Sequence, residues 1–168
     1  MHIIHKGSFD YISCELTCVE CGHAMKDPVE AELQTKISNN PQNRIIKVGD
    51  YLRGKSNPET ASYFILNNNY QPDNFTFIED WFCDGCGPFK WVRFEVCDTT
   101  LKKSEVVQLN TDICHKTDLL PLSVANMIPS KLTNEMPVNI RQLLNKDKFK
   151  FVELIVNHSK LIIESQRQ

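Results

Sequence analysis

The stretch FTFIEDWFCDGCGPFKWVRFEVCDTTLKKSEVVQLN, residues 75–110, decides the fold of this chain. It is rich in aromatic and branched apolar residues, which favour strands, and apolar positions alternate from 91 to 96. A polar turn at Asp98–Thr100 then sends the chain back through a second apolar run. The sequence therefore predicts a β-hairpin over Phe89–Leu109 that leaves the CDGCG motif.

The CDGCG motif at Cys83–Gly87 has a near copy far upstream, CVECG at Cys18–Gly22. A CxxC turn lets two thiolates converge on one ion, and the glycine after it can take a positive φ that turns backbone N–H groups toward sulfur. Two such halves complete a tetrahedron. We therefore predict a closed metal site with four ligands: Cys18, Cys21, Cys83 and Cys86. The predicted cofactor is a structural Zn²⁺ ion, with iron as the alternative in a similar sulfur cage.

The predicted ion would join the start of the fold to the aromatic hairpin and contribute folding free energy. Two other interpretations stay open: a redox-active CxxC pair, and buried cysteines without a ligand. A dithiol oxidoreductase places its motif at the start of a helix and needs one copy only, so the duplication favours a metal. A closed four-thiolate site binds but does not catalyse.

The remaining cysteines and nearby histidines are weaker candidates. Cys14 is expected to be buried, with a role as an alternative ligand left open, and Cys97 is expected in the core. Cys114 and His115 are suited to metal or nucleophile chemistry, but neighbouring residues in an extended chain point in opposite directions. His23, just past the first motif, is expected in solvent, with a hydrogen bond to sulfur as the alternative.

The rest of the N-terminal part is predicted to add short strands. Residues 2–14 have the apolar and aromatic mixture of a strand, 29–37 alternate with a period of two, and 44–54 form a second short strand. The polar segment 55–74 is interpreted as a long surface excursion.

Prolines divide the last third of the chain. Two brief helices are predicted in PLSVANMIPSKL (121–132) and PVNIRQLLN (137–145), and an amphipathic helix over 147–165 should dock on the sheet. The predicted fold is α+β: a mainly antiparallel β core with a four-cysteine zinc knuckle site and a C-terminal helical tail. Residues 1–110 form the zinc-stapled β domain and 111–168 a helical extension packed on it.

Composition narrows the class of protein. The chain has 168 residues, of which 41% are hydrophobic and 24% charged, as expected for a folded protein. It begins without the pattern of a signal peptide and contains no run of about 18 apolar residues, so we expect a cytoplasmic protein that makes no membrane contact. A formal net charge of −2 gives no global basic field for nucleic acid.

Aromatic and basic residues around the second motif suggest a further alternative. Their ordinary role is to build the core around the metal. The other interpretation is a stacking surface for single-stranded nucleic acid, formed by Phe75, Phe77, Trp81, Phe82, Phe89 and Trp91 with Lys90, Arg93, Lys102 and Lys103. Acidic residues interrupt the basic set, which makes nucleic acid a less favoured partner.

Four segments, FDYISC (9–14), ELQTK (32–36), VGDYL (48–52) and WVRFEVCDTTL (91–101), resemble a family of short uncharacterised phage and bacterial proteins. Members begin with an FDxIxC-like phrase, carry a QTK strand, and in some cases carry paired CxxC zinc knuckles. This chain differs in having Leu33 where the family has an aromatic residue, and DTTL where it has a DG turn. The resemblance implies a small zinc-ribbon-like β fold from phages or bacterial conflict, and no catalytic residue.

The leading functional hypothesis is a non-enzymatic zinc-binding module for protein interaction, such as an immunity or inhibitor protein that neutralises a toxin or a host factor. No paired carboxylates, nucleophile elbow or phosphate loop is recognisable in the sequence. The alternative is a nucleic-acid-binding zinc protein, for instance a phage-encoded regulator. An enzyme that uses Cys114 or an open metal position is a third hypothesis.

Overall fold

The stretch that decides the fold forms the centre of a computed structural model, which describes residues 9–38, 42–52, 62–67, 70–127 and 147–166. Its three long strands are β7 (Phe75–Cys83), β8 (Gly87–Cys97) and β9 (Thr100–Val107), paired antiparallel in that order. The two-residue loop between β8 and β9 consists of Asp98 and Thr99, both with positive φ (50° and 61°). Such a loop matches the twist of a hairpin, so the predicted hairpin is confirmed.

Two short strands complete the central sheet, whose order is β6-β10-β7-β8-β9. Strand β6 (Tyr63–Ile65) pairs antiparallel with β10 (Leu119–Pro121), and β10 pairs parallel with β7. Both strands correct the sequence interpretation. The apolar island within the predicted surface excursion is a strand, and the region assigned to a helical extension supplies β10. Neither is recognisable locally, because each is three residues long and its partner lies far away in sequence.

A second, smaller sheet has the order β4-β1-β5. It contains β1 (Asp10–Ser13), β4 (Gln34–Thr35) and β5 (Ile45–Lys47), with β1 antiparallel to β4 and parallel to β5. The predicted strand over 29–37 is therefore mostly wrong. The alternation of burial does run from Ala31 to Ile37, but the chain before it forms turns.

The turn before β4 has a local cause. The backbone N–H of Val29 donates to the Asp27 carboxylate at 2.8 Å, and the N–H of Ala31 donates to the Asp27 carbonyl at 3.0 Å. Glu32 takes a positive φ of 50°. An aspartate that bonds the backbone two residues later favours a turn over a strand, and Val29 is consequently exposed.

In the part of the chain that the structure describes, three helical segments follow the central hairpin: α1 (Thr111–His115), the 3₁₀ helix η2 (Leu122–Met127) and α4 (Lys148–Gln166). The amphipathic helix predicted over 147–165 is confirmed as α4. The helix predicted in 121–132 is replaced at its start by β10 and continues as η2, and the one predicted over 137–145 lies outside the described residues. None of the helices in the described part is both long and apolar enough to cross a membrane.

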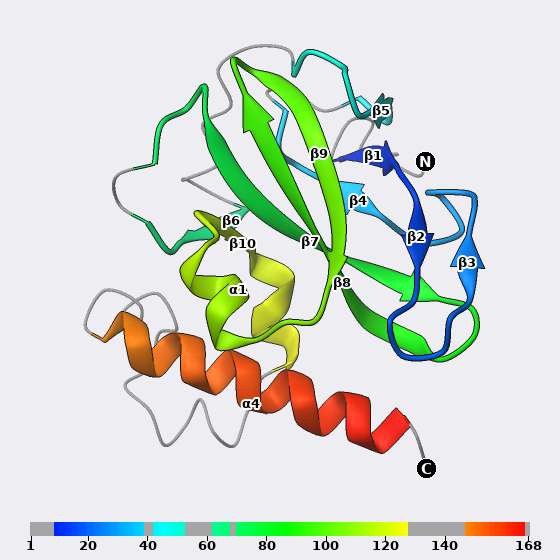
Figure 1. Cartoon of the computed structure of the whole chain (residues 1–168), viewed down its shortest axis with the longest axis vertical. Helices are drawn as coiled ribbons and strands as arrows, with labels where there is room; N and C mark the ends of the chain where they lie inside the picture. The colour runs from blue at the N-terminus through cyan, green and yellow to red at the C-terminus, as the bar shows by residue number, and fades with distance from the viewer. Residues whose placement is uncertain (1–8, 39–41, 53–61, 68–69, 128–146, 167–168) are drawn as a thin grey trace, which may run out of the picture.

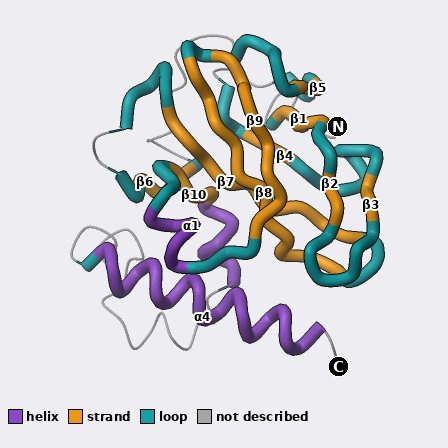
Figure 2. The backbone as a smooth tube through the Cα atoms, in the orientation of Figure 1, coloured by secondary structure: helices purple, strands orange, loops and turns teal. Residues whose placement is uncertain are grey.

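The central sheet separates two apolar cores, because alternate side chains of each strand point to opposite faces. One face carries Phe77, Trp81 and Phe94 toward the small sheet. The other carries Ile78 and Trp91 toward the helices, where it is covered by Phe151, Val152, Ile155 and Val156 of α4. Figure 1 shows α4 beside α1, away from β1, β4 and β5, and Figure 2 shows how strands dominate the rest. The fold is mainly β with few helices, in agreement with the predicted α+β class.

Candidate metal centre

The first CxxC turn is held by a miniature hairpin of β2 (Leu16–Thr17) and β3 (Ala24–Met25). The backbone N–H of Cys18 donates to the His23 carbonyl at 2.9 Å, and the N–H of Gly22 donates to the Cys18 carbonyl at 2.9 Å. Gly22 has a φ of 74°, as its position after the second cysteine predicted. These bonds fold the motif into a closed loop from which both sulfurs point the same way.

The second CxxC turn closes the far end of the β7–β8 hairpin. Cys83 is the last residue of β7 and pairs with Gly87, the first residue of β8. Gly87 has a φ of 102°, again as predicted. In Figure 1 this end of the β7–β8 hairpin lies beside β2 and β3. The two motifs therefore meet as two turns at hairpin tips rather than at the start of a helix, where a redox CxxC pair is normally placed.

The four predicted cysteines come together. Their Sγ atoms all lie within 4.8 Å of one another. The Sγ of Cys18 lies 3.5 Å from that of Cys86, and the Sγ of Cys21 lies 3.6 Å from that of Cys83. Four sulfurs at about 2.3 Å from one ion in a tetrahedron would be about 3.8 Å apart. The sulfur cluster therefore has the size that a tetrahedral thiolate site for a metal ion requires.

Gly85 allows the two turns to approach this closely. A Cβ atom at this position would lie 2.7 Å from the Cys21 sulfur and 3.1 Å from the His23 Cβ. The first distance is well inside van der Waals contact, so any larger residue would push the first turn away from the second. The glycine is visible in the CDGCG motif of the sequence, but the reason for a glycine at position 85 becomes clear only from the packing of the two turns.

Backbone amides and a buried lysine favour negative charge on these sulfurs. A hydrogen bond from the His23 backbone N–H lowers the pKa of the Cys21 thiol. Burial raises the pKa of Cys83 although the amides of Cys86 and Gly85 point to its sulfur. Burial also raises the pKa of Cys86, to about 12, against the positive charge of Lys90. Without a cation the Cys83 and Cys86 thiols stay protonated, and a bound metal ion would replace those protons.

The four cysteines of the centre differ in their exposure to solvent. Cys18 and Cys83 are buried, Cys86 is partly buried and Cys21 is exposed. His23 is exposed, as predicted. The buried pair makes the site part of the core, and the exposed Cys21 edge gives a path by which an ion can enter.

The other cysteines lie apart from the centre. Cys14 is partly buried, and burial raises its pKa to about 11. Cys114 is buried among apolar side chains, which raises its pKa to about 12, whereas His115 is exposed and its ring stacks on Phe149. Cys97 was predicted in the core but is exposed, because it is the last residue of β8 before the turn.

Most aromatic residues near the second motif build the core instead of a surface. Phe75, Phe77, Trp81 and Trp91 are all buried, and so is Lys90. The Arg93 guanidinium is held by the Thr117 hydroxyl, the Glu95 carboxylate and the Lys116 carbonyl. These side chains are therefore not available as a stacking platform for bases.

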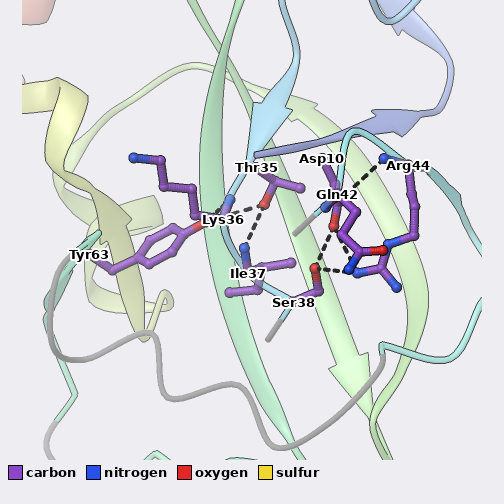
Figure 3. Close-up of polar contacts among 8 residues, drawn as sticks. All are labelled: Asp10, Thr35, Lys36, Ile37, Ser38, Gln42, Arg44 and Tyr63. Carbon is purple, nitrogen blue, oxygen red and sulfur yellow. Dashed lines mark hydrogen bonds and ion pairs between the residues drawn. The ribbon is translucent and has the colours of Figure 1, made fainter. Parts of the chain in front are cut away.

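Two buried polar clusters, one on either side of β4, were not predicted from the sequence. Buried Asp10 accepts hydrogen bonds from the Ser38 hydroxyl at 2.5 Å, from the backbone N–H groups of Gln42 and Arg44 at 2.9 Å each, and from the Arg44 side chain at 3.2 Å. Burial alone would raise its pKa, but these bonds outweigh burial, and the pKa of Asp10 is lowered. Figure 3 shows Ser38 beside Asp10 and Arg44, where its hydroxyl also accepts a hydrogen bond from the Arg44 side chain at 3.2 Å.

The second cluster surrounds Glu79. The Tyr63 hydroxyl donates to the Glu79 carboxyl at 2.5 Å, and the backbone N–H of Lys36 donates to the Tyr63 oxygen at 3.1 Å. Figure 3 shows Tyr63 reaching β4 beside Thr35 and Lys36. Burial raises the pKa of Glu79 well above its usual range and likewise that of Tyr63. The acidic pair Glu79–Asp80 within an otherwise apolar strand is the signal for this cluster in the sequence.

Comparisons of the chain with protein-family models, with curated proteins and with solved structures found no match. The resemblance to short phage and bacterial proteins therefore stays a prediction.

Proposed function

We propose that the cysteine cluster binds a Zn²⁺ ion as a structural centre, in a non-enzymatic protein that acts by binding another protein, such as an immunity or inhibitor protein. The observation that carries the metal assignment is the convergence of four Sγ atoms within 4.8 Å. The ligands would be Cys18, Cys21, Cys83 and Cys86. Four thiolates fill the coordination of a tetrahedral ion, which favours zinc and a structural role over catalysis.

The bound ion would supply folding energy where the fold has little of its own. Strands β2 and β3 are two residues each, so the first CxxC turn has few backbone hydrogen bonds to hold it against the sheet. Two-stranded hairpins of this size are not stable alone in water. Cross-linking the hairpin to the end of β7–β8 would fix it in place.

An exposed apolar surface supports the protein-binding role. Ile45 is 52% exposed and Tyr51 is 64% exposed, and both line a hollow of about 280 Å³ together with Arg44. Tyrosine and arginine are enriched in protein interfaces, and exposed apolar side chains grouped in one region mark contact sites. We name this surface, formed by Arg44, Ile45 and Tyr51, the β5 surface.

Metal analysis tests the structural centre. The purified chain should contain about one zinc ion per molecule, measured by mass spectrometry of the metals, and a strong chelator should lower its melting temperature. Iron in place of zinc would support the four-cysteine site and would change only the identity of the bound metal. Protein without stoichiometric metal that melts identically with and without chelator would contradict the proposal.

Affinity capture from the native host tests the binding role. The tagged chain should recover one protein partner in stoichiometric amount, and Tyr51→Ala combined with Ile45→Asp should abolish the recovery. The matched control is Val29→Asp, which changes a side chain that is 47% exposed outside the β5 surface. Recovery of nucleic acid alone, or of a partner that the double variant still binds equally, would overturn the role assigned to this surface.

A further inference from the structure

Strand β9 lies at one edge of the central sheet. The start of this edge is already paired within the chain. The Gly49 backbone N–H donates to the Leu101 carbonyl at 2.7 Å, and the Leu101 N–H donates to the Asp50 carbonyl at 3.0 Å. Beyond Leu101, no segment in the described part of the chain pairs with the outer side of β9. The rest of the strand therefore presents backbone N–H and C=O groups that can accept a further strand.

The space beside this edge is open on one face of the sheet. A groove of about 670 Å³ separates β9 from residues 13–17, and Ser104 and Val106 line it on the β9 side. Figure 1 shows β9 as the outermost strand of the central sheet, with β1 and β2 beyond it. Side chains of an added strand point alternately to the two faces of the sheet. The groove leaves room for those on this face.

The opposite face of β9 carries an alternating pattern of charge. Lys103 pairs with Glu95 of β8, and Glu105 pairs with Arg93. Cross-strand partners share a face, so two rows of opposite charges cross β8 and β9, and each row ends in an exposed side chain on β9. None of the ion pairs among the described residues involves Lys103 or Glu105. The ends of both rows can therefore meet charges on a neighbouring strand.

This pattern is complementary to itself. When two copies of β9 run antiparallel about a two-fold axis at Ser104, Lys103 of each copy faces Glu105 of the other. Each row of charges then alternates in sign across four strands, in the order arginine, glutamate, lysine, glutamate. Lysines on an edge strand normally discourage pairing with another chain, but here a glutamate two residues later supplies the opposite charge. Residues 103–107 pair with β8 without a shift in register, so this part of the strand is regular.

We propose that two copies of this chain associate through their β9 strands into one continuous sheet, with Ser104 at the two-fold axis. An interface in which the same patch meets itself is typical of a two-fold dimer, and backbone hydrogen bonds between the two strands extend the sheet. The charges select a second copy over a strand that carries one sign only, because Lys103 and Glu105 both find a partner. The proposal goes beyond the protein-binding role and does not depend on the metal ion or on the β5 surface.

Analytical ultracentrifugation of the purified full chain measures the association. We expect a concentration-dependent equilibrium between a monomer of 19.4 kDa and a dimer of twice that mass. Added salt should weaken it, because exposed ion pairs are screened. Hydrogen exchange above and below the dissociation constant should show that dimerisation protects backbone amides within 102–107. A monomer at every concentration up to about 1 mM, or protection in other segments in place of this one, would overturn the proposal.

Charge reversals test the pairing of the two strands. Lys103→Glu places a glutamate opposite Glu105 of the other copy, and Glu105→Lys places a lysine opposite Lys103. Each variant should therefore weaken self-association about 10- to 100-fold. A mixture of the two variants should form a heterodimer with about the affinity of the wild type, because every cross-strand pair then has opposite signs.

Controls separate this pairing from general effects of charge and of folding. Lys150→Glu makes the same change at an exposed side chain of α4 and should leave association unchanged. Lys103→Gln and Glu105→Gln serve if a reversal fails to fold, and each should weaken association about three- to tenfold. Single reversals that dimerise as tightly as the wild type, or folded reversal variants that do not associate when mixed, would overturn the proposal.

Discussion

The two faces of the central sheet are covered in different ways. On the helix side, α4 contributes Phe151, Val152 and Ile155 as a continuous apolar stripe. On the other side, which we call the knuckle side, the covering strands are two to four residues long, and buried polar residues such as Asp10 and Glu79 lie among the apolar ones.

The layer on each face of the sheet is stabilised according to how much regular secondary structure it contains. A helix satisfies its backbone internally and needs only an apolar stripe to dock. Strands of two residues make too few ladder bonds to fix their position, so the knuckle side relies on specific links: the cysteine cluster and the hydrogen bonds to buried carboxyls. We therefore expect the knuckle side to respond to single ligands and to pH, and the helix side to respond to side-chain volume.

The largest effect should come from removing a cysteine of the cluster. Cys83→Ser should abolish stoichiometric metal binding and lower the free energy of unfolding by at least about 4 kcal/mol, because the link between the two turns is lost. Metal analysis and denaturant unfolding measure both. Cys97→Ser, at an exposed cysteine, is the control and should shift stability by less than about 0.5 kcal/mol. Equal stability of the two variants would remove the proposed role of the ion.

On the helix side, a change in the volume of a buried side chain should have the largest effect on stability. Phe151 is fully buried and its ring meets that of Phe64 edge to face at 5.0 Å. Phe151→Ala should cost about 3–5 kcal/mol through lost burial and the cavity it leaves. Phe149→Ala, two residues earlier and 63% exposed, should cost less than about 0.5 kcal/mol. If both variants unfold at the same denaturant concentration, α4 does not cover the sheet as described.

A pH-dependent effect should appear at Asp10. Its folded pKa lies below the ordinary value of 3.8, so its charge stabilises the fold above about pH 4, and this contribution is lost as pH falls through the lowered pKa. Asp10→Asn should cost about 2 kcal/mol at pH 7 and progressively less below pH 4. Unfolding measured from pH 7 to pH 2.5 gives the difference. A constant difference across this range would show that Asp10 is not ionised in the fold; Asp112→Asn, at an exposed side chain, should show little effect at any pH.

The smallest effect concerns the start of α1. The Asn110 side chain accepts a hydrogen bond from the Ile113 backbone N–H at 2.8 Å and so caps this helix. Asn110→Ala should cost about 1 kcal/mol in thermal unfolding, whereas Asn110→Asp, which keeps an acceptor oxygen, should be nearly neutral. The same loss in both variants would assign the effect to something other than the cap.

Local patterns predicted those parts that are long and self-contained. The β8–β9 hairpin and the helix α4 each follow a period that extends over many residues, and the cysteine motifs occur twice with glycine at the same place. The prediction of a strand over 29–37 was mostly wrong, because the Asp27 carboxylate accepts a hydrogen bond from the Val29 backbone N–H and stabilises a turn. The prediction that Cys97 lies in the core was also wrong, because burial of the last residue of a strand depends on which segments cover the turn that follows it.

The amino-acid sequence alone specifies four cysteines in two matching pairs, because each pair is set by a turn of five residues. The three-dimensional fold is needed to explain why Gly85 leaves room for the Cys21 sulfur and why short strands from distant segments extend the sheet beyond β7. It is also needed to place an arginine beside Asp10 and a cavity beside Glu79. The two kinds of feature depend on interactions of different range. Turns and periodic elements are fixed by neighbours in the chain, whereas the environment of a buried charge is set by residues that meet only when the fold is complete.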